Sequence, residues 1–430
     1  MGSAAGRARP IARLSDGYNG DEATILAERD KQYVIIGNGV AGTTAAETIR
    51  KNDPNCRVIL IGDEPYPLYN RVALPPFIKR RVDRRKVTLR TVEAHAELGI
   101  DLRLCTRVIS VDAADRTVVT SEGDELRYDA LLVATGGRPN GLDVPGAELK
   151  GIYNFQYLDD ALGILERVET AKVAVAVGGS YIAYELAEAF RHDGLETFWL
   201  IRGNRFLRRV LDEDGGAFVD DIATQAGVQT IYNDAVAEVK SDNGQVRTVV
   251  TQQGLHLKTD MLGIGVGLTM NMEFLSGTGV ETRYGVLTNE YLETNVPGIY
   301  AAGDVAEFFD VVIERHNMMG TWGNSIGHGR IAAMNMLGQR TRYYDVPMYS
   351  STLFDSFIRV IGLTPENYPD LESYERLDVR NRSYQRLFFL GNRLVGACLI
   401  GNSRFRTRIF TLIKSQEEIP VEDRARLLEE

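Results

Sequence analysis

A short glycine-rich segment near the start of the chain has residue types and spacing that suit the binding of a dinucleotide pyrophosphate. Gly37 makes a tight turn, Gly39 lets the backbone approach the phosphates, and Gly42 lets a helix pack closely on the preceding strand. Val40 and Ala41 lie at the start of that helix, whose N-terminus faces the phosphates with partial positive charge. The segment therefore predicts a dinucleotide site.

The elements that must position this loop are evident around it. Apolar strand patterns at residues 33–36 and 57–61 flank an alanine-rich helical pattern at residues 43–50, which is the order of a βαβ unit. Such a site needs an acidic residue about 20 positions after the loop to bind a ribose hydroxyl. Asp63 and Glu64 lie at that distance and are both candidates.

A second loop farther along the chain keeps the spacing but replaces two glycines. Ser180 stands at the second glycine position and Ala183 at the third. Strand patterns at residues 173–177 and 197–201 flank a helical pattern at residues 184–190, so a second βαβ unit is predicted. The residues expected to face its nucleotide are Gly178, Ser180, Tyr181 and Ile182.

The residues after the second unit's last strand indicate which nucleotide it binds. An NAD site carries a carboxylate there, whereas this chain has Arg202 and Arg208. Guanidinium groups pair bidentately with a 2′-phosphate, which a carboxylate would repel. The pattern favours NADPH over NADH. The alternative is that some of the arginines in this stretch, such as Arg205 and Arg209, are ordinary surface charges.

Composition limits the classes of protein that the chain can represent. The 430 residues suit two to three domains, and 44% hydrophobic and 25% charged residues are typical of a globular protein. A net charge of -10 argues against nucleic-acid binding, and no apolar run is long enough for a membrane span. The three cysteines are far apart and form no metal-type or disulfide pattern, so we expect no metal site and a cytoplasmic location.

Four sequence motifs in a fixed order carry a resemblance to a known family. They read GNGVAG, LLVATGGRP, VAVGGSYIAYELA and GIYAAGDVA, and from about Lys31 to the C-terminus the chain resembles the pyridine nucleotide-disulfide oxidoreductase superfamily. The resemblance implies an α/β fold with two Rossmann-like domains and a small α+β C-terminal interface domain. The implied division is a flexible tail at 1–30, an FAD-binding domain at 31–150 and 285–345, an NAD(P)-binding domain at 151–284, and an interface domain at 346–430.

The C-terminal segment is rich in aromatic and β-branched residues in strand patterns and differs in this from the rest of the chain. Strand patterns at residues 386–390 and 394–400 flank the turn Gly391-Asn392, and a helix pattern follows at 404–415.

The resemblance also implies roles for individual residues. Glu185 would lie near the nicotinamide and the flavin ring and is the candidate catalytic residue. Its expected neighbour is a lysine, but Pro76 stands at the lysine position, and Lys79, one turn later, is the candidate substitute. The helix matched by residues 315–327 would face the flavin, with His316 as a weaker candidate. Further implied contacts to the cofactor FAD come from Arg71, Val108, Thr135, Gly136, Gly303 and Asp304, and Tyr349 lies where some members place an aromatic ring.

The departure from the family's disulfide reductases concerns thiols. The chain has no CxxxxC pair, and residues 70–78 contain no cysteine, so thiol chemistry at the flavin is not expected. The stretch at residues 67–71 resembles the cysteine-free branch, which contains ferredoxin and rubredoxin reductases, flavin parts of nitrite reductases and apoptosis-inducing-factor-like proteins. This likeness implies an NAD(P)H oxidoreductase whose electrons leave the flavin for an iron–sulfur or rubredoxin-type protein.

Two alternatives stay open, and a basic segment bears on the choice of partner. The chain could be the flavin subunit of a larger oxidoreductase that delivers electrons to NAD(P)+, or a slow signalling flavoprotein like apoptosis-inducing factor. The basic segment at residues 79–86, with Arg90 behind it, is either a solvated face or a docking surface for an acidic redox partner. The sequence leaves room for an oligomer.

Overall fold

The computed structural model describes residues 30–401 and 406–429, and residues 31–430 form one unit by their contacts. The tail predicted at 1–30 therefore lies outside the described residues except for Asp30. Among the helices in the described part of the chain, none is long and apolar enough to cross a membrane.

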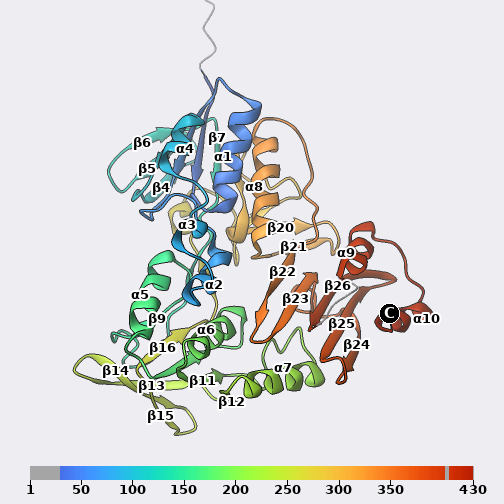
Figure 1. The fold of residues 1–430 in the computed structure, drawn as a ribbon. Helices are drawn as coiled ribbons and strands as arrows, with labels where there is room; N and C mark the ends of the chain where they lie inside the picture. The colour runs from blue at the N-terminus through green and yellow to red at the C-terminus, as the bar shows by residue number, and fades with distance from the viewer. Residues whose placement is uncertain (1–29, 402–405, 430) are drawn as a thin grey trace, which may run out of the picture. The chain divides into compact units, whose positions relative to one another are not determined.

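The first loop belongs to a five-stranded parallel sheet of order β19-β7-β1-β2-β3. The central strands are buried on both faces and therefore carry continuous runs of branched residues such as Val34 to Ile36. Helices α1 (Val40–Asn52) and α8 (Trp322–Met336) pack against each other beside this sheet (Figure 1). The strands are β1 (Gln32–Ile36), β2 (Arg57–Ile61), β3 (Ile100–Arg103), β7 (Ala130–Val133) and β19 (Ile299–Ala301).

The second loop belongs to another parallel sheet, of order β12-β11-β10-β16-β9. Its strands are β9 (Ile152–Tyr153), β10 (Val173–Val177), β11 (Glu196–Ile201), β12 (Val228–Tyr232) and β16 (Met261–Ile264). Its helices are α5 (Leu158–Val168), α6 (Tyr181–His192) and α7 (Glu213–Gln225). The chain leaves the first sheet after β7 and returns to it with β19, which supports the predicted insertion of one nucleotide-binding domain into another. The domain boundaries stay a prediction.

The C-terminal part contains an antiparallel sheet of order β22-β23-β26-β25-β24. The turn Gly391-Asn392 joins β25 to β26, and Gly391 has a φ of +58°, which suits glycine. The strands are β22 (Met348–Leu353), β23 (Ser356–Gly362), β24 (Glu372–Asp378), β25 (Ser383–Leu390) and β26 (Arg393–Ile400), followed by α9 (Arg406–Ser415), α10 (Val421–Arg424) and the 3-10 helix η4 (Ala425–Leu428). Residues 404 and 405 of the predicted helix lie outside the described residues.

Smaller elements complete the described fold. Three sheets comprise β4 (Val108–Asp112), β5 (Thr117–Thr120) and β6 (Glu125–Arg127); β13 (Val236–Asp242), β14 (Gln245–Thr251) and β15 (His256–Lys258); and β18 (Val286–Thr288), β20 (Ala306–Asp310) and β21 (Arg315–Asn317). Strand β8 (Gly137–Pro139) pairs with β17 (Leu268–Met270). The short helices are α2 (Leu74–Ile78), α3 (Arg84–Val87), α4 (Val92–Glu97), η1 (Arg71–Ala73), η2 (Glu273–Leu275) and η3 (Gly303–Val305).

The predicted α/β fold is confirmed, with two corrections to its elements. Helices α1 and α6 begin three residues earlier than the sequence pattern indicates, because Gly39 and Ser180 already serve as their N-caps. The segment at 315–327 is not one helix: residues 315–317 form β21, and α8 begins at Trp322 after the N-cap Thr321. Thr321 accepts a hydrogen bond from the Asn324 N–H at 3.3 Å, which fixes that helix start.

Candidate functional site

The first glycine loop has a backbone shape that other residues could not adopt. Gly37 has a φ of +107°, its N–H donates to the Ile61 carbonyl at 2.7 Å, and a side chain there would collide with the Ala134 carbonyl. A side chain at Gly42 would collide with the carbonyl of Gly37. At Gly39, the N-cap of α1, the space that a side chain would fill is open. Open space over a helix N-terminus fits the pyrophosphate of FAD.

Asp304 lies next to the start of this helix. A side chain at Gly303 would come 3.0 Å from Ala41 Cβ, so η3 and the first turn of α1 are neighbours. Ser325 Oγ donates to Asp304 Oδ1 at 3.1 Å, and burial raises the pKa of the Asp304 carboxyl. Burial also lowers the pKa of His328 to about 3, so its neutral Nδ1 can accept the Gly303 N–H at 3.3 Å. These bonds hold η3 where the resemblance places the ribityl chain of FAD.

The two acidic candidates for the ribose contact, Asp63 and Glu64, lie in different surroundings. The Asp63 side chain is 56% exposed and pairs with Arg107 at 3.2 Å. The Glu64 side chain is 17% exposed and accepts hydrogen bonds from Tyr69 Oη and Arg71 Nη2, both at 2.7 Å. Asp63 therefore has more freedom to meet a ribose hydroxyl, while Glu64 holds Arg71.

Arg71 is held from several sides. Its Nη1 donates to the Gln156 carbonyl at 2.7 Å, and its guanidinium lies 5.0 Å from the ring centre of Tyr69 and 5.2 Å from that of Tyr157. Its charge also lowers the pKa of Asp304, against the larger effect of burial. Arg71 and Asp304 therefore act on the same region, and direct contact of Arg71 with FAD stays a prediction.

The remaining predicted FAD contacts lie at strand ends. Thr135 Oγ1 donates to the Asn271 carbonyl at 2.6 Å, and Asn271 Nδ2 donates back to the Thr135 carbonyl at 3.2 Å. Gly136 has a φ of +59° and open space at its missing side chain. Val108 is buried at the start of β4, opposite Thr120. The contacts of these residues with FAD stay predictions.

The second glycine loop repeats the backbone shape of the first. Gly178 has a φ of +130°, and a side chain there would collide with the Gly265 carbonyl. Ser180 Oγ donates to the same carbonyl at 2.9 Å, and Trp199 Nε1 donates to the Gly178 carbonyl at 2.8 Å. Tyr181 and Ile182 occupy the half-buried first turn of α6. The second N-terminus is therefore also built to approach a phosphate.

Arg202 and Arg208 are exposed in the segment after β11. The Leu207 N–H donates to the Gly179 carbonyl at 3.1 Å, which ties this segment to the glycine loop. A side chain at Gly203 would come 3.3 Å from Arg208 Cδ, so Arg208 folds back toward the end of β11. The predicted 2′-phosphate residues thus lie beside the loop that would hold the nucleotide.

Glu185 is buried in α6 and bonded to the C-terminal sheet. Tyr349 Oη and Ser351 Oγ each donate to Glu185 Oε1 at 2.9 Å, and Tyr184 Oη lies 3.1 Å from Tyr349 Oη. The ring of Tyr349 contacts that of Tyr181 at a tilt of 39°, with 4.0 Å between ring centres. Burial raises the pKa of Glu185 to about 7, although both hydrogen bonds lower it.

Lys79 is also buried, which corrects its assignment to the exposed basic segment. Its Nζ lies 2.9 Å from Glu188 Oε1 and donates to Thr352 Oγ1 at 3.1 Å, while Thr352 Oγ1 lies 3.0 Å from both Glu188 oxygens. The lysine therefore pairs one helical turn beyond Glu185, although its charge still lowers the pKa of Glu185.

Sequence reasoning did not find Glu188, Ser351 or Thr352. Two periodicities could have suggested the first two residues. Glu188 lies three residues after Glu185, on the same side of the helix, and Ser351 lies two residues after Tyr349, on the same side of the strand.

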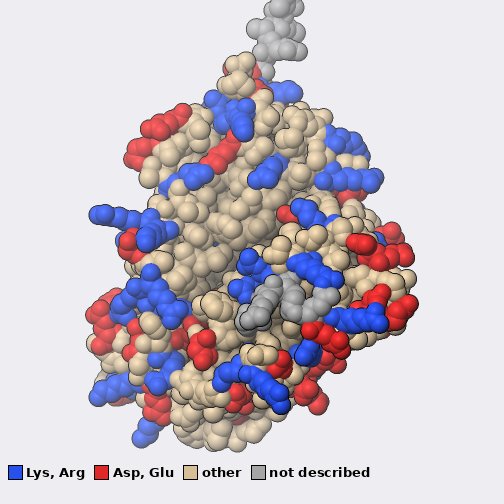
Figure 2. Space-filling view, turned by 45° about the vertical axis from the view of Figure 1, so that its right-hand side comes forward, with Lys and Arg blue, Asp and Glu red and all other residues tan. Residues whose placement is uncertain are grey.

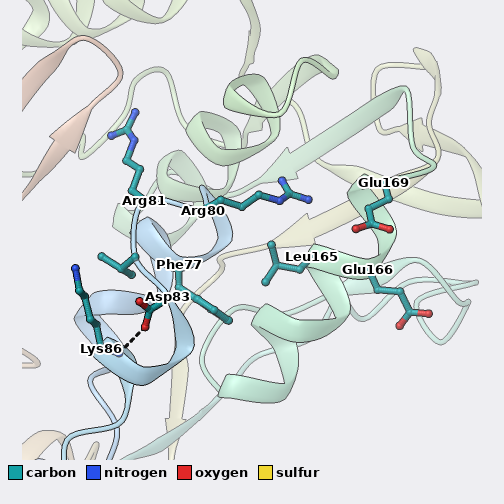
Figure 3. Close-up of a pocket in the computed structure, with 9 residues that line it drawn as sticks. Phe77, Arg80, Arg81, Asp83, Lys86, Leu165, Glu166 and Glu169 are labelled. Carbon is teal, nitrogen blue, oxygen red and sulfur yellow. Dashed lines mark hydrogen bonds between the residues drawn. The ribbon is translucent and has the colours of Figure 1, made fainter.

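The exposed basic residues flank an open cavity of about 760 Å³. In Figure 3, Arg81 and Lys86 lie on one side, Glu166 and Glu169 lie at the C-terminal end of α5 on the other, and Arg80 points across toward Glu169. Phe77, Val82 and Leu165 form its apolar lining. Figure 2 shows acidic and basic side chains interspersed over the face that it presents.

Two dinucleotide loops on two parallel sheets define the class of two-nucleotide flavoproteins, and comparison with known proteins specifies the family. The family model described as pyridine nucleotide-disulphide oxidoreductase matches residues 31–329. The chain belongs to this family, and its cofactors are FAD and NAD(P)H.

Individual relatives are similar over most of this chain. It is 27% identical to the NAD(P)H nitrite reductase of Bacillus subtilis over 90% of its own length, but it spans only 48% of that relative. It is 29% identical to the putidaredoxin reductase of Pseudomonas putida, with 84% of this chain and 86% of the relative covered. The crystal structure of a ferredoxin reductase from Rhodopseudomonas palustris matches with a TM-score of 0.86 and 25% identity, covering 92% of this chain and 97% of that one.

Proposed function

We propose that the protein is an FAD-dependent NAD(P)H:acceptor oxidoreductase that passes electrons to an iron–sulfur or rubredoxin-type protein. One combined observation carries the proposal. The chain has two helix N-termini suited to binding phosphate, and its cysteines are not placed for disulfide chemistry. Similarity to putidaredoxin reductase and to a ferredoxin reductase supports this kind of acceptor.

The placement of the cysteines argues against a thiol as the electron acceptor. Burial raises the pKa of Cys398 to about 12, and burial also raises the pKa of Cys56. Cys105 is exposed in the connection between β3 and β4 and is not followed by a second cysteine nearby. Because the thiolate is the reactive form, electrons have to leave by another route.

The residues of the chain position and shield the reacting groups. FAD supplies the hydride-accepting ring and can release its electrons singly. The two helix N-termini would hold the phosphates, η3 would hold the ribityl chain, and Arg71 would add positive charge nearby. Glu185, held by Tyr349 and Ser351, would border the nicotinamide in a site from which water is largely excluded.

The nucleotide that this proposal favours is NADPH. Arg202 and Arg208 are exposed beside the second glycine loop, where their charge favours a 2′-phosphate. NADH stays the alternative, and relative rates with the two nucleotides decide between them.

Docking of the acceptor is proposed at the basic segment, without Lys79. Arg81, Arg84, Arg85 and Lys86 are exposed beside the cavity or on α3. Arg80 instead pairs with Asp193 at 2.6 Å, and Arg90 pairs with Glu47 at 2.6 Å. A partner with an acidic surface would be steered to the unpaired part of this segment.

A comparison of electron acceptors tests the proposal. The FAD-loaded protein is mixed with NADPH or NADH and one of three acceptors: a two-iron ferredoxin, an artificial one-electron acceptor, or oxidised glutathione. We expect turnover with the first two and negligible turnover with the disulfide. Turnover with the disulfide alone would contradict the proposal.

A second candidate is favoured by the relative of which the chain spans about half. In this reading, the protein is the flavin subunit of a larger oxidoreductase and delivers electrons to NAD(P)+. Purification from the native host tests it: stable copurification with iron–sulfur subunits supports this candidate, and isolation of the chain alone supports the first.

A further inference from the structure

The C-terminal sheet is bonded to the segment that carries the predicted 2′-phosphate arginines. On β25, Arg386 Nη1 donates to the Val210 carbonyl at 3.1 Å. From the same strand, Tyr384 Oη donates to Asp212 Oδ1 at 2.9 Å. The two acceptors lie two and four residues after Arg208, so β25 holds the end of this segment.

The two residues of β25 are themselves well fixed. Tyr384 is fully buried, and its ring packs so closely on α7 that a side chain at Gly215 would come 2.7 Å from it. Arg386 donates to Ser373 Oγ of the neighbouring strand from Nε at 3.2 Å and from Nη2 at 2.9 Å. The anchor is therefore rigid compared with the exposed arginines that it supports.

Hydrogen bonds continue from this anchor to the glycine loop. Arg205 Nε donates to the Leu211 carbonyl at 3.0 Å, and Arg205 Nη2 donates to the Arg208 carbonyl at 3.4 Å. Directly before Arg208, the Leu207 N–H donates to the Gly179 carbonyl at 3.1 Å. The backbone that carries Arg208 is thus fastened to the nucleotide loop on one side and to β25 on the other.

Asp212 adds a second connection, to the helix that follows. It is the N-cap of α7, and its Oδ1 accepts the Gly215 N–H at 2.8 Å as well as the Tyr384 hydroxyl. In a Tyr384→Phe variant, Asp212 would still cap α7 but would no longer be bonded to β25. The segment that ends at Asp212 could then shift without loss of the helix start.

We propose that Tyr384 and Arg386 are positioning residues for nucleotide selectivity, because they hold the backbone from which Arg208 would meet the 2′-phosphate of NADPH. The proposal rests on the proposed use of NADPH and extends it to residues of the C-terminal sheet. A long, exposed arginine loses conformational freedom when it binds a phosphate, and a fixed backbone lowers that cost. The benefit applies only to the nucleotide that has the extra phosphate.

Variants that remove the anchoring bonds test the proposal. Arg386→Met keeps much of the side-chain length without the hydrogen bonds, and Tyr384→Phe removes only a hydroxyl. For each, we expect KM for NADPH to rise about fivefold to tenfold, the scale of one or two lost hydrogen bonds, while kcat and KM for NADH stay nearly unchanged. Arg386→Lys, which can reach Val210 but not Ser373 together with it, should recover part of the change.

A binding measurement separates positioning from general damage. Calorimetry with adenosine 2′,5′-bisphosphate and with ADP as probes should show weakened binding of the first probe only. Arg382→Met is the matched control, because Arg382 lies on the turn before β25 and bonds instead to Gln225 at the far end of α7, at 2.7 Å. The control should leave the affinity for both probes unchanged.

The outcomes distinguish this proposal from the one on which it rests. If Arg202→Glu removes the preference for NADPH but Arg386→Met and Tyr384→Phe leave it intact, the positioning role is overturned and NADPH use stands. An equal loss of affinity for both probes also overturns it, since that result indicates a general structural role. If Arg202→Glu does not change the preference, the assignment of the NADPH site itself is wrong.

Discussion

The protonation state of Glu185 affects the stability of the folded protein. It is a buried carboxyl whose oxygen accepts two hydroxyl hydrogen bonds, and its pKa rises from 4.5 to about 7 because burial disfavours the charged form. The folded protein therefore holds this proton more tightly than the unfolded chain does. The stabilisation is complete below the ordinary pKa and is lost as the pH rises through about 7.

A Glu185→Gln variant should lack this pH dependence. Relative to the wild type, its free energy of unfolding should increase by about 3 kcal/mol between a pH below 4.5 and a pH above about 7. Denaturant unfolding of both proteins across this range measures the difference. A difference that does not change with pH would show that the Glu185 carboxyl is not perturbed as described.

An Arg202→Glu variant tests the nucleotide assignment. The introduced carboxylate repels a 2′-phosphate, so kcat/KM for NADPH should fall on the order of tenfold to a hundredfold, and that for NADH far less. Lys258→Glu, an exposed charge reversal on β15, is the control. A wild type that oxidises NADH at least as efficiently as NADPH would contradict the assignment.

For single residues, the sequence was most informative at positions where the backbone conformation tolerates few residue types. Gly37 and Gly178 both have positive φ and meet a carbonyl where a side chain would lie, so the glycines marked the loops. The partners of Glu185 could not be foreseen in the same way. Tyr349 lies 164 residues away, and the contact depends on the packing of α6 against β22.

At the scale of elements, the charged residue Lys79 at the end of α2 is buried in the core. The buried Lys79–Glu188 pair joins α2 to α6, and Thr352 adds β22. The sequence offered Lys79 both as a member of a basic surface segment and as a substitute for the lysine expected near Glu185. The first interpretation was wrong, because a run of charged residues does not reveal that its first member points inward, and the structure pairs Lys79 with Glu188 instead of Glu185. The prediction of one helix at residues 315–327 was wrong for another reason: Thr321 is an N-cap inside the stretch, so α8 begins only at Trp322.

Removal of one member of this buried pair should be costly. Lys79→Met leaves the Glu188 carboxylate without its cation and should lower the free energy of unfolding by about 3–5 kcal/mol. The double variant Lys79→Met/Glu188→Leu should lose clearly less. Lys240→Met, which breaks an exposed pair with Glu238 at 3.6 Å, is the control and should cost under about 1 kcal/mol.

Equal losses in the single and the double variants would contradict this explanation. Such a result would indicate that the packing of the lysine chain, rather than its charge pairing, stabilises the junction of α2, α6 and β22.

At the scale of the whole molecule, the motifs correctly indicated two parallel sheets because each strand, loop and helix is contiguous in sequence. The motif at Gly298 to Asp304 also anticipated the return of β19 to the first sheet. The bonds from Tyr384 and Arg386 to the segment after β11 had no such signal, because they join sheets that are distant in the chain.

The proposed docking of an acidic redox partner depends on how charge is distributed over the protein surface. Combined Arg81→Glu, Arg84→Glu and Arg85→Glu changes should raise KM for an acidic ferredoxin on the order of tenfold at low salt and flatten its salt dependence. Turnover with a small neutral acceptor should not change. Charge reversals at the exposed Lys150 and Lys258 are the control, and an equal effect there would contradict a specific docking surface.

Anaerobic rapid mixing of the FAD-loaded protein tests the proposed electron route most directly. The protein is first mixed with one equivalent of NADPH and then with a two-iron ferredoxin, while flavin and iron–sulfur absorbance are followed. We expect rapid loss of the oxidised flavin signal, followed by its return as two ferredoxin molecules are reduced for each flavin. A flavin that stays oxidised with both NADPH and NADH, or a reduced flavin that transfers electrons to a disulfide but not to ferredoxin, would contradict the proposed function.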